Sequence, residues 1–337
     1  MADEITYLEA ITAGLAGALR DDARVFCIGE DIGHFGGAFG VTKGLLDEFG
    51  PERIIDTPIS EEAFVGAAMG AAWMGERPIV ELQFADFVAC PFDQIVTVVA
   101  KTHWRSGIAL PMVIRMPGGA GVRGGPYHSQ SPEGWFVGEA GLKVVCPGTV
   151  ADAYGLLRSA IEDDDPVIFF EPKRIYNGPF DGDPAKPAVG WDQHPMGEVP
   201  LDYYQVPIGK AAIARAGSAV TIVTYGTMVH VCAAAAADLG IDAEIVDVRT
   251  MVPLDIDTLA ASVNKTGRCL IAHEATRFAG FGAELSASIQ EACFWRLEAP
   301  IARVAGWDTP YPHAFEWEYF PGRARVRMAL ESLMKTA

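Results

Sequence analysis

Residues 78–116 read PIVELQFADFVACPFDQIVTVVAKTHWRSGIALPMVIRM, and this stretch contains the repeating unit of the fold. Its two ends, 78–82 and 112–116, are short and mostly apolar, which is typical of buried strands. Between them, apolar residues recur at helical spacing over 92–105. A strand, a helix and a second strand in this order predict a crossover unit of a parallel sheet.

The same alternation continues on both sides of this stretch. We expect further strands at 25–29, 143–146 and 167–171, with helices at 61–74 and 151–163. From residue 219 the pattern restarts, with strands expected at 220–224, 243–248, 268–272 and 301–305 and helices starting at Met228, Asp255 and Ala283. The predicted fold class is therefore α/β with two domains, each a mainly parallel sheet flanked by helices.

Proline marks the boundary between the two patterns. Eight of the 22 prolines fall within residues 166–207, where they remove sheet donors and disfavour helix in the residue before each. We therefore predict a first domain at 1–171, an extended linker on the surface at 172–207 and a second domain at 208–337. The 337 residues allow two domains, at roughly 150 residues each.

Charge and composition exclude several classes of protein. The net charge of −18 would repel a nucleic-acid backbone or an anionic membrane. No apolar run of about 18 residues indicates a membrane span, and no export signal is visible at the start, so we expect a cytoplasmic protein. The six cysteines form no C-x-x-C pair, and we expect most of them to be buried and reduced.

Two familiar motifs fail in their context. Residues 119–124, GAGVRG, match the dinucleotide fingerprint, but Gly125 and Pro126 follow where that fingerprint must open a helix. His273 begins a sequence, HEATR, that lacks the second histidine of a metalloprotease helix. We therefore expect neither nicotinamide binding nor a zinc site, and the glycine loop must carry something else.

Two other segments are candidates for chemistry. In residues 56–62, DTPISEE, Ser60 is a plausible helix N-cap, and Glu61 and Glu62 would occupy the first turn. Acids there complement the helix dipole, but such a turn also presents catalytic groups beside the carboxyl end of a strand. His128 lies in a polar loop, 127–133, YHSQSPE, where it is either an active-site imidazole or an ordinary loop residue.

Motifs in a constant order carry a resemblance that covers nearly the whole chain. They are GED at 29–31, DTPISE at 56–61, ELQFADF at 81–87, DQI at 93–95, YHSQSPE at 127–133, GLKVV at 141–145, DVRT at 247–250, HEA at 273–275 and WDTPYP at 307–312. The sequence resembles the β subunit of the thiamine-diphosphate-dependent 2-oxoacid dehydrogenases, the decarboxylating first component of the large oxoacid complexes. This resemblance implies a pyrimidine-binding domain followed by a transketolase C-terminal-like domain.

The subtype is suggested by two segments. IED at 161–163 through FEPK at 170–173, together with LEAPI at 297–301, is most similar to the branched-chain 2-oxoacid enzyme. Pyruvate and acetoin dehydrogenases remain open as alternatives. An alternative of another class is a non-catalytic scaffold subunit, which would need neither Glu61 nor His128.

The resemblance assigns the catalytic roles to Glu61 and His128. Glu61 would hydrogen-bond the far pyrimidine nitrogen of thiamine diphosphate and favour the imino tautomer, whose nitrogen takes the thiazolium proton. His128 would face the cofactor across a subunit interface and donate a proton to the sulfur of lipoamide during acyl transfer.

Four further residues match cofactor-side positions of the family. Phe87 falls where the family places an aromatic ring beside the pyrimidine, often Tyr, so the stacking is kept and the hydroxyl is lost. Ile59 and Gln83 match positions near the pyrimidine or the acyl pocket. Glu30 matches an acidic residue that links the two active centres of the tetramer.

The resemblance also implies a potassium site that joins a strand to the end of a helix. Its oxygen ligands would come from Leu110, Met112, Val113, Ala160, Asp163 and Asp165. The alternative is an ordinary acidic helix terminus, EDDDP at 162–166, whose carboxylates are solvated without an ion.

The sequence lacks the magnesium-binding and diphosphate-binding motif of thiamine-diphosphate enzymes, and this absence indicates a partner chain. Enzymes that use thiamine diphosphate hold the diphosphate through magnesium with a Gly-Asp-Gly and a downstream Asn pair, and the chain has neither sequence. We therefore expect the α subunit of an α2β2 heterotetramer to supply the magnesium and diphosphate ligands. The other expected partners are the lipoyl acyltransferase component and a small 2-oxoacid substrate.

Overall fold

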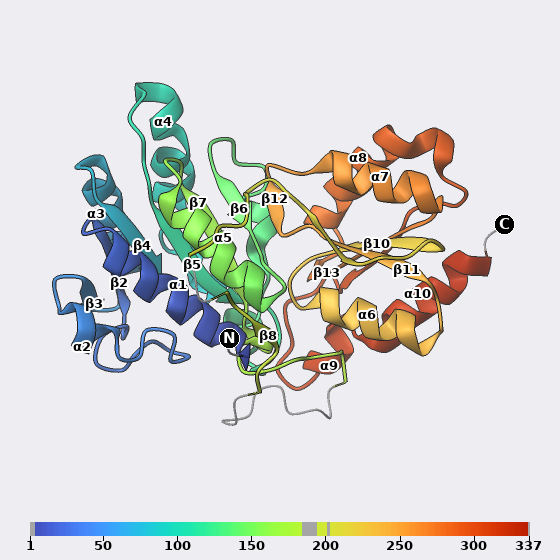
Figure 1. The fold of residues 1–337 in the computed structure, drawn as a ribbon, viewed down its shortest axis with the longest axis horizontal. Helices are drawn as coiled ribbons and strands as arrows, with labels where there is room; N and C mark the ends of the chain where they lie inside the picture. Colours follow the sequence, from blue (N-terminus) through green and yellow to red (C-terminus); the bar gives the residue numbers. More distant parts are fainter. Residues whose placement is uncertain (1–3, 184–193, 201–202, 336–337) are drawn as a thin grey trace.

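A computed structural model describes residues 4–183, 194–200 and 203–335. Figure 1 shows two sheets side by side, each with helices on both faces, the first built from the blue-to-green part of the chain and the second from the yellow-to-red part. The predicted α/β class with two mainly parallel sheets is confirmed.

The first sheet has seven strands in the order β12-β6-β7-β5-β4-β2-β3. Strands β2 to β7 pair in parallel, whereas β12 runs antiparallel to β6 at the edge. The strands are β2 (Val25–Glu30), β3 (Ile54–Thr57), β4 (Arg77–Glu81), β5 (Val113–Gly118), β6 (Lys143–Val145), β7 (Val167–Pro172) and β12 (Thr250–Val252). Because β12 comes from beyond residue 208, the second half of the chain completes the first sheet.

Helices cover both faces of this sheet. They are α1 (Tyr7–Asp21), α2 (Leu45–Phe49), α3 (Glu61–Trp73), α4 (Ala100–Ser106) and α5 (Val150–Glu162). Alternate residues of the strands point to opposite faces, so Cys27 and Ile79 pack in the core with α1 and α5, and Ile28 and Val80 pack in the core with α3. Thr6 and Glu9 form a capping box that fixes the start of α1.

The helix expected over 92–105 is a composite. It consists of a π-helical segment, η2 (Gln94–Val99), which runs directly into α4. The single-turn or short helices η1 (Ala85–Ala89), η3 (Gly125–Tyr127), η4 (Pro132–Trp135), η5 (Lys173–Ile175) and η6 (Phe294–Arg296) complete the local structure. Helical spacing of apolar residues does not distinguish a π segment from an α-helix over so few turns.

The second sheet has five strands in the order β14-β13-β10-β11-β9, with β9 antiparallel to β11. The strands are β9 (Ala212–Arg215), β10 (Val220–Thr224), β11 (Ala243–Asp247), β13 (Cys269–Thr276) and β14 (Ala302–Gly306). The helices are α6 (Met228–Asp238), α7 (Ile256–Thr266), α8 (Phe281–Cys293), α9 (Glu316–Tyr319) and α10 (Arg323–Lys335). Figure 1 shows α7 and α8 on one face and α6 and α10 on the other.

The two hydrophobic cores follow the faces of the sheets and continue from one sheet to the other. Residues from α1 and α5 share a core with Met228 and Val326 of the second unit. On the opposite faces, Phe64 and Val65 of α3 share a core with Leu259. The two units are therefore joined through buried apolar contacts on both sides.

The predicted linker does not lie wholly on the surface. Ile175, Tyr176 and Phe180 are buried in the core, and Lys173 and Arg174 are buried with them. A short strand, β8 (Gly197–Glu198), pairs with β1 (Glu4–Ile5). The expectation of an extended surface path was wrong for 173–180, because proline spacing reports backbone restriction and not exposure. Pro184 and Pro187 lie outside the described residues.

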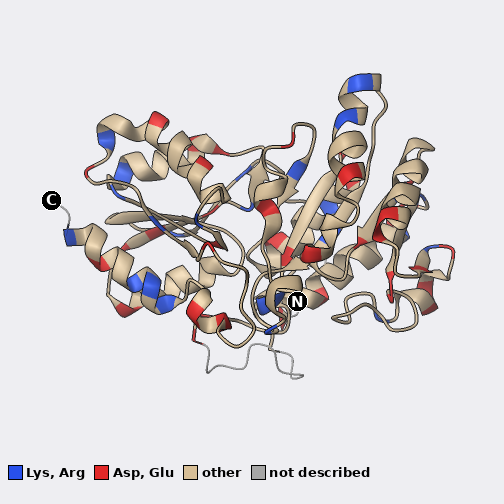
Figure 2. Ribbon diagram, turned by 180° about the vertical axis from the view of Figure 1, so that it is seen from behind, with Lys and Arg blue, Asp and Glu red and all other residues tan. Residues whose placement is uncertain are grey.

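Two further sequence expectations can be compared with the structure. All six cysteines are free, and five are buried while Cys90 is exposed, as expected for thiols that act mostly as small apolar residues. None of the described helices has the length and apolar character needed to span a membrane. Figure 2 shows acidic residues on the elements of both units, and α10 carries several basic residues.

Candidate functional site

The candidate site lies at one edge of the first sheet, where parallel strands end. Strand β2 ends at Glu30, β4 is followed by Gln83 and Phe84, and the glycine loop follows β5. These strands are neighbours and run in the same direction, so their carboxyl ends meet. Ligands of open α/β sheets bind at this edge.

Helix α3 starts at Glu61, immediately after the N-cap residue Ser60. The Ser60 hydroxyl makes no capping hydrogen bond and donates to the Pro58 carbonyl at 2.9 Å. The expected capping role of its side chain is therefore wrong, because the hydroxyl is used within the turn. The Ser60 backbone N–H instead donates to Oε1 of Glu30 at 3.2 Å, which ties the start of α3 to the end of β2.

Glu30 and Glu61 form a pair of acids at this junction. The Glu30 side chain is buried, and burial together with the neighbouring Glu61 charge raises the pKa of Glu30 above its usual value. Within the described residues, no Lys or Arg forms an ion pair with either carboxylate. Negative groups without a protein cation are suited to hydrogen-bond a ligand that approaches this edge.

Three rings contact one another beyond the end of β4 and form what we call the ring wall. The His128 ring lies edge-on to the Phe84 ring, with centroids 4.7 Å apart, and to the Phe87 ring at 5.5 Å. Phe84 and Phe87 also contact each other edge-to-face at 5.6 Å. Two sequence candidates, Phe87 and His128, are thus brought together although 41 residues separate them. Phe84 was missed as a candidate, and its spacing of three residues from Phe87 was the available signal.

Gln83 connects the acids to the rings. Its Nε2 donates to Oδ2 of Asp31 at 2.9 Å. Asp31 has a φ of 58°, a left-handed conformation that is unusual for a residue with a side chain and that often marks a functional turn. Contacts along the chain therefore connect Glu30 through Asp31, Gln83 and Phe84 to His128.

Ile59 differs from the other predicted residues. It is 86 % exposed and makes no core contact. An apolar side chain held outward directly beside Glu61 is suited to contact a partner or ligand that covers the edge.

A buried ionic cluster joins the strands that carry the candidate site. Arg115 of β5 donates to Oε2 of Glu81 at 2.7 Å and to Oε1 of Glu171 at 2.6 Å, and these three side chains are almost fully buried. The Tyr176 hydroxyl also donates to Glu171. The two carboxylates and the guanidinium join β4, β5 and β7, which fixes the strands that carry the site.

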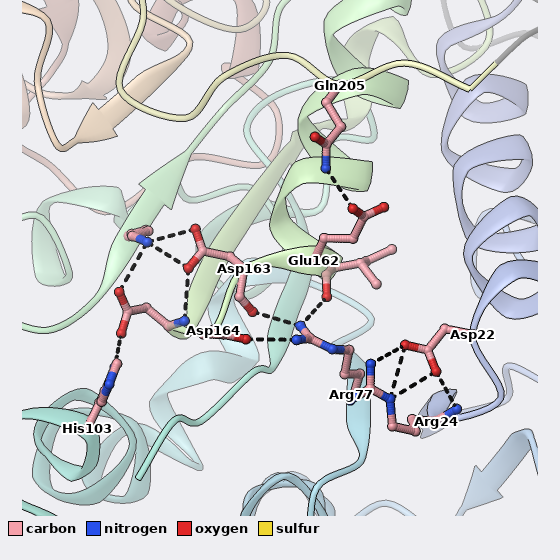
Figure 3. Close-up of polar contacts among 11 residues, drawn as sticks. Asp22, Arg24, Arg77, His103, Glu162, Asp163, Asp164 and Gln205 are labelled. Atoms are coloured by element: carbon pink, nitrogen blue, oxygen red, sulfur yellow. Dashed lines mark hydrogen bonds and ion pairs between the residues drawn. The ribbon is translucent and has the colours of Figure 1, made fainter. Parts of the chain in front are cut away.

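Of the residues predicted to bind potassium, Asp163 follows the C-terminal end of α5 and contacts protein groups there (Figure 3). The Lys143 ammonium lies 2.6 Å from Oδ1 of Asp163 and 3.1 Å from Oδ2 of Asp165. His103 Nδ1 is 2.5 Å from the other Asp165 oxygen. Ala160 is buried in α5 behind these carboxylates.

Backbone oxygens of the same set are used in the same way. Arg77 donates to the carbonyls of Ile161 and Asp163, each at 3.0 Å, and the Met112 carbonyl accepts from the Val167 N–H at 3.0 Å. Two protein cations thus stand at the negative end of the α5 dipole. The side chains of Asp163 and Asp165 as arranged here do not fit a potassium ion, because the Lys143 ammonium lies against both carboxylates.

Comparisons with known proteins agree with this architecture. Residues 3–179 match the family model "Transketolase, pyrimidine binding domain", and residues 209–326 match "Transketolase, C-terminal domain". A solved structure, "Split gene transketolase, inactive beta4 tetramer", superposes with a TM-score of 0.76 over 99% of both chains at 20% identity, which shows the common fold.

Curated relatives are more similar in sequence. The 2-oxoisovalerate dehydrogenase subunit beta of Pseudomonas aeruginosa is 53% identical over 98% of this chain and 95% of its own length. The subunit of the same name from Bacillus subtilis is 42% identical over 98% of both chains. The mitochondrial subunit of Dictyostelium discoideum is 43% identical over 99% of this chain and 86% of its own length.

The fold and the two family models define a transketolase-like protein, and its relatives belong to the thiamine-diphosphate-dependent class. Within that class, the chain belongs to the family of 2-oxoisovalerate dehydrogenase β subunits, a component of the 2-oxoacid dehydrogenases.

Proposed function

We propose that this chain, together with an α subunit in an α2β2 heterotetramer, catalyses the oxidative decarboxylation of branched-chain 2-oxoacids and transfers the acyl group to lipoamide of an acyltransferase component. The observation that carries the proposal is the sheet edge itself. It combines the unneutralised acids Glu30 and Glu61 with a wall of Phe84, Phe87 and His128. The identity of 53% to a 2-oxoisovalerate dehydrogenase β subunit supports the choice of substrate class.

The residues at the edge fit the pyrimidine half of thiamine diphosphate. Glu61, at the start of α3, offers a carboxylate that no described cation neutralises, which suits a hydrogen bond to a protonated ring nitrogen. Phe87 offers a ring face or edge for stacking. When bound, thiamine diphosphate supplies the electron sink that decarboxylation of a 2-oxoacid requires.

The role of Glu61 would be to hydrogen-bond the pyrimidine ring of the bound cofactor. The Glu61 carboxylate would hold a protonated ring nitrogen of the bound pyrimidine by a hydrogen bond, and the cofactor would supply the group that accepts a proton. Glu30 fixes the position of Glu61, because it holds the Ser60 N–H and thereby the first turn of α3.

His128 is placed to move a proton at the other side of the wall. Its ring contacts Phe84 and Phe87, which limit its orientation and exclude water from one side. An imidazole can be both donor and acceptor near neutral pH, which suits proton donation to the departing sulfur during acyl transfer.

The other half of the site must come from the α subunit. This chain has no Gly-Asp-Gly and no Asn pair to hold magnesium and diphosphate. Ile59, which is 86% exposed beside the first turn of α3, offers an apolar group at this edge for a partner to cover. We place the α subunit over the edge that carries Ile59.

Two experiments test this proposal. The chain is co-expressed with candidate α subunits. Carbon dioxide release is measured with branched-chain 2-oxoacids and pyruvate, and acetaldehyde release is measured with acetoin, which has no carboxyl group to lose. The highest kcat/KM for a branched-chain 2-oxoacid supports the proposal, whereas preference for pyruvate or acetoin assigns the chain to the alternative enzymes. No turnover with any α subunit would favour a scaffold.

The divided site is tested by calorimetry. The purified chain alone is titrated with thiamine diphosphate and magnesium, and we expect weak or undetectable binding because the diphosphate ligands are absent. Tight binding by the isolated chain would overturn the assignment of these ligands to the α subunit.

A further inference from the structure

The loop that leads to His128 is held by the second unit of the chain. Residues 119–124 connect the end of β5 to η3, and His128 follows η3 directly. Two carboxylates reach this loop from far along the sequence, Glu274 in β13 and Glu316 at the start of α9. Neither belongs to the sheet that carries the candidate site.

The two carboxylates accept hydrogen bonds from three backbone amides of the loop. The Ala120 N–H donates to Oε2 of Glu274 at 2.9 Å. The N–H groups of Gly121 and Arg123 donate to Oε1 and Oε2 of Glu316 at 3.2 Å and 2.9 Å. Both oxygens of Glu316 are thus used by one short loop, and hydrogen bonds to a charged acceptor are stronger than neutral ones.

A third contact comes from the same region. Nδ1 of His313 lies 2.7 Å from the carbonyl oxygen of Arg123, which accepts the ring N–H. Gly125 must remain glycine at this contact, because it has a φ of +69° and a Cβ there would come within 2.4 Å of the His313 ring. His313 and Glu316 therefore hold both the N–H and the carbonyl of Arg123.

The loop needs these contacts because its own conformation is strained. Gly119 and Gly121 have φ values of 78° and 124°, and Arg123 has a φ of 50°. A non-glycine residue in the left-handed region costs about 1–2 kcal/mol, so surrounding contacts must hold Arg123 there.

Buried cations offset the negative charge of the carboxylates around this loop. Glu316 is fully buried, and Lys173 and Arg174 are nearly so. Lys173 donates to the Gly119 carbonyl, and its burial lowers its pKa to about 8, against the opposing effect of the Glu274 charge. The charges of Glu274 and Glu316 are therefore balanced by those of Lys173 and Arg174. Burying the two carboxylates without these cations would be costly.

We propose that Glu316 is a positioning residue for the reaction: it clamps the glycine loop to the second unit and so sets where the His128 ring meets Phe84 and Phe87. This inference rests on the proposed function for its effect on turnover. The contact itself is independent of that function. It gives the second unit a role in positioning a residue of the candidate active site.

The test compares Glu316→Gln with Glu318→Gln in the co-expressed α/β complex. In Glu316→Gln the side-chain amide keeps the shape of the carboxylate but replaces one acceptor by a donor, so a loop hydrogen bond is lost. Glu318 lies on the same short helix with an exposed side chain and serves as the matched control. Glu316→Asp keeps the charge and is expected to rescue part of the effect.

The first readout is hydrogen–deuterium exchange of the amides in residues 120–128, which does not depend on turnover. We expect exchange about 10-fold faster in Glu316→Gln and unchanged in Glu318→Gln, because a lost hydrogen bond lowers the local free energy of opening. Equal exchange in both variants and the wild type would overturn the clamp, whatever substrate the complex uses.

The second readout separates the two half-reactions. We expect acyl transfer to a lipoyl domain to fall roughly 10- to 100-fold, with decarboxylation measured by an artificial acceptor changed much less. Equal loss in both, with a lower melting temperature than Glu318→Gln, would show that Glu316 only stabilises the fold. A wild-type complex without 2-oxoacid turnover would instead refute the proposed function, and the exchange result would still decide the clamp.

Discussion

Two acidic clusters in the first unit are similar in composition and differ in how their charge is balanced. Glu30 and Glu61 meet at the sheet edge without an ion pair among the described residues. Asp163 and Asp165, at the end of α5, are bound by Lys143 and His103 (Figure 3).

The difference lies in the elements around each cluster. Arg77 and Lys143 are the first residues of β4 and β6, which begin beside the C-terminus of α5, so two cations lie near the negative end of its dipole. The edge that carries Glu61 has rings and glycines instead. A carboxylate that the chain leaves unneutralised at a ligand-binding edge points to chemistry, whereas a neutralised one points to structure.

The largest expected effect is on Glu61. Glu61→Gln should leave assembly intact and lower decarboxylation by about 10²- to 10⁴-fold. The amide keeps the shape of the side chain but loses the charged hydrogen-bond acceptor. Carbon dioxide release by the co-expressed complex is the measurement.

Glu62→Gln is the matched control, since Glu62 is the next residue of α3 and is exposed. Near-normal turnover of Glu61→Gln would make both glutamates simple helix-dipole acids and would remove the contrast between the two clusters.

His128 should show a selective effect. His128→Ala is expected to retain measurable decarboxylation with an artificial acceptor and to lose about 10²- to 10⁴-fold in reductive acylation of a lipoyl domain, because a positioned proton donor is removed. His194→Ala, at an exposed histidine, is the control. Equal losses in both assays would mean that the ring holds the cofactor or the loop, and no loss would return His128 to an ordinary loop residue.

Much of the fold was predictable from local patterns. Buried parallel strands are continuous apolar runs, so β2, β4, β7 and β10 were predicted within two residues of their observed ends. The edge strands β3, β9 and β12 were missed, because they are short and pair with only one neighbour. Strand β12 lies in the second half of the chain but pairs with β6 in the first sheet. This pairing is tertiary, so no local sequence pattern predicts it.

The candidate site was predicted in part. Glu61, His128, Phe87, Gln83 and Glu30 could be proposed from motifs. The structure brings Phe87 into contact with His128 and joins Glu30 to the Ser60 N–H at the start of α3. Glu316 could not be proposed, because 193 residues separate it from the Arg123 amide that it holds. The residues predicted to bind potassium include Asp163 and Asp165, but the sequence did not reveal that Lys143 would contact both carboxylates.

A smaller effect is expected at the neutralised cluster. The wild-type chain should melt at the same temperature in potassium, sodium and choline chloride of equal ionic strength, because Lys143 and Arg77 already supply the positive charge. A higher melting temperature specifically in potassium would show that an ion displaces Lys143 and would support the potassium site.

Lys143→Met tests the same cluster from the protein side. Removing the ammonium leaves Asp163 and Asp165 less neutralised and should lower stability by about 1–2 kcal/mol, or a few degrees in melting temperature. Lys101→Met is the control, since Lys101 forms a single surface ion pair with Glu139. Equal melting temperatures of the two variants would mean that the cluster contributes no more than an ordinary surface pair.

The smallest effect is a difference in the sign of pH dependence between the two clusters. Burial would raise the pKa of Asp165, but hydrogen bonds from His103 and Lys143 outweigh it and hold that pKa below its usual value. The ionised form of Asp165 therefore stabilises the fold above its unfolded pKa of about 3.9, and this contribution is lost as the pH falls through the lower folded value.

Glu30 should behave in the opposite way. Burial and the Glu61 charge raise its pKa, so the protonated form is favoured in the fold, and its contribution is present below the unfolded pKa of about 4.3 and is lost as the pH rises through the folded value. Melting curves of the purified chain from acid to neutral pH measure both effects. Relative to wild type, Asp165→Asn should lose stability and Glu30→Gln should gain it near neutral pH, and both differences should shrink in acid. Changes of the same sign in the two variants would show that the clusters are electrostatically alike, and the contrast between a ligand-binding edge and a structural corner would then lack its physical basis.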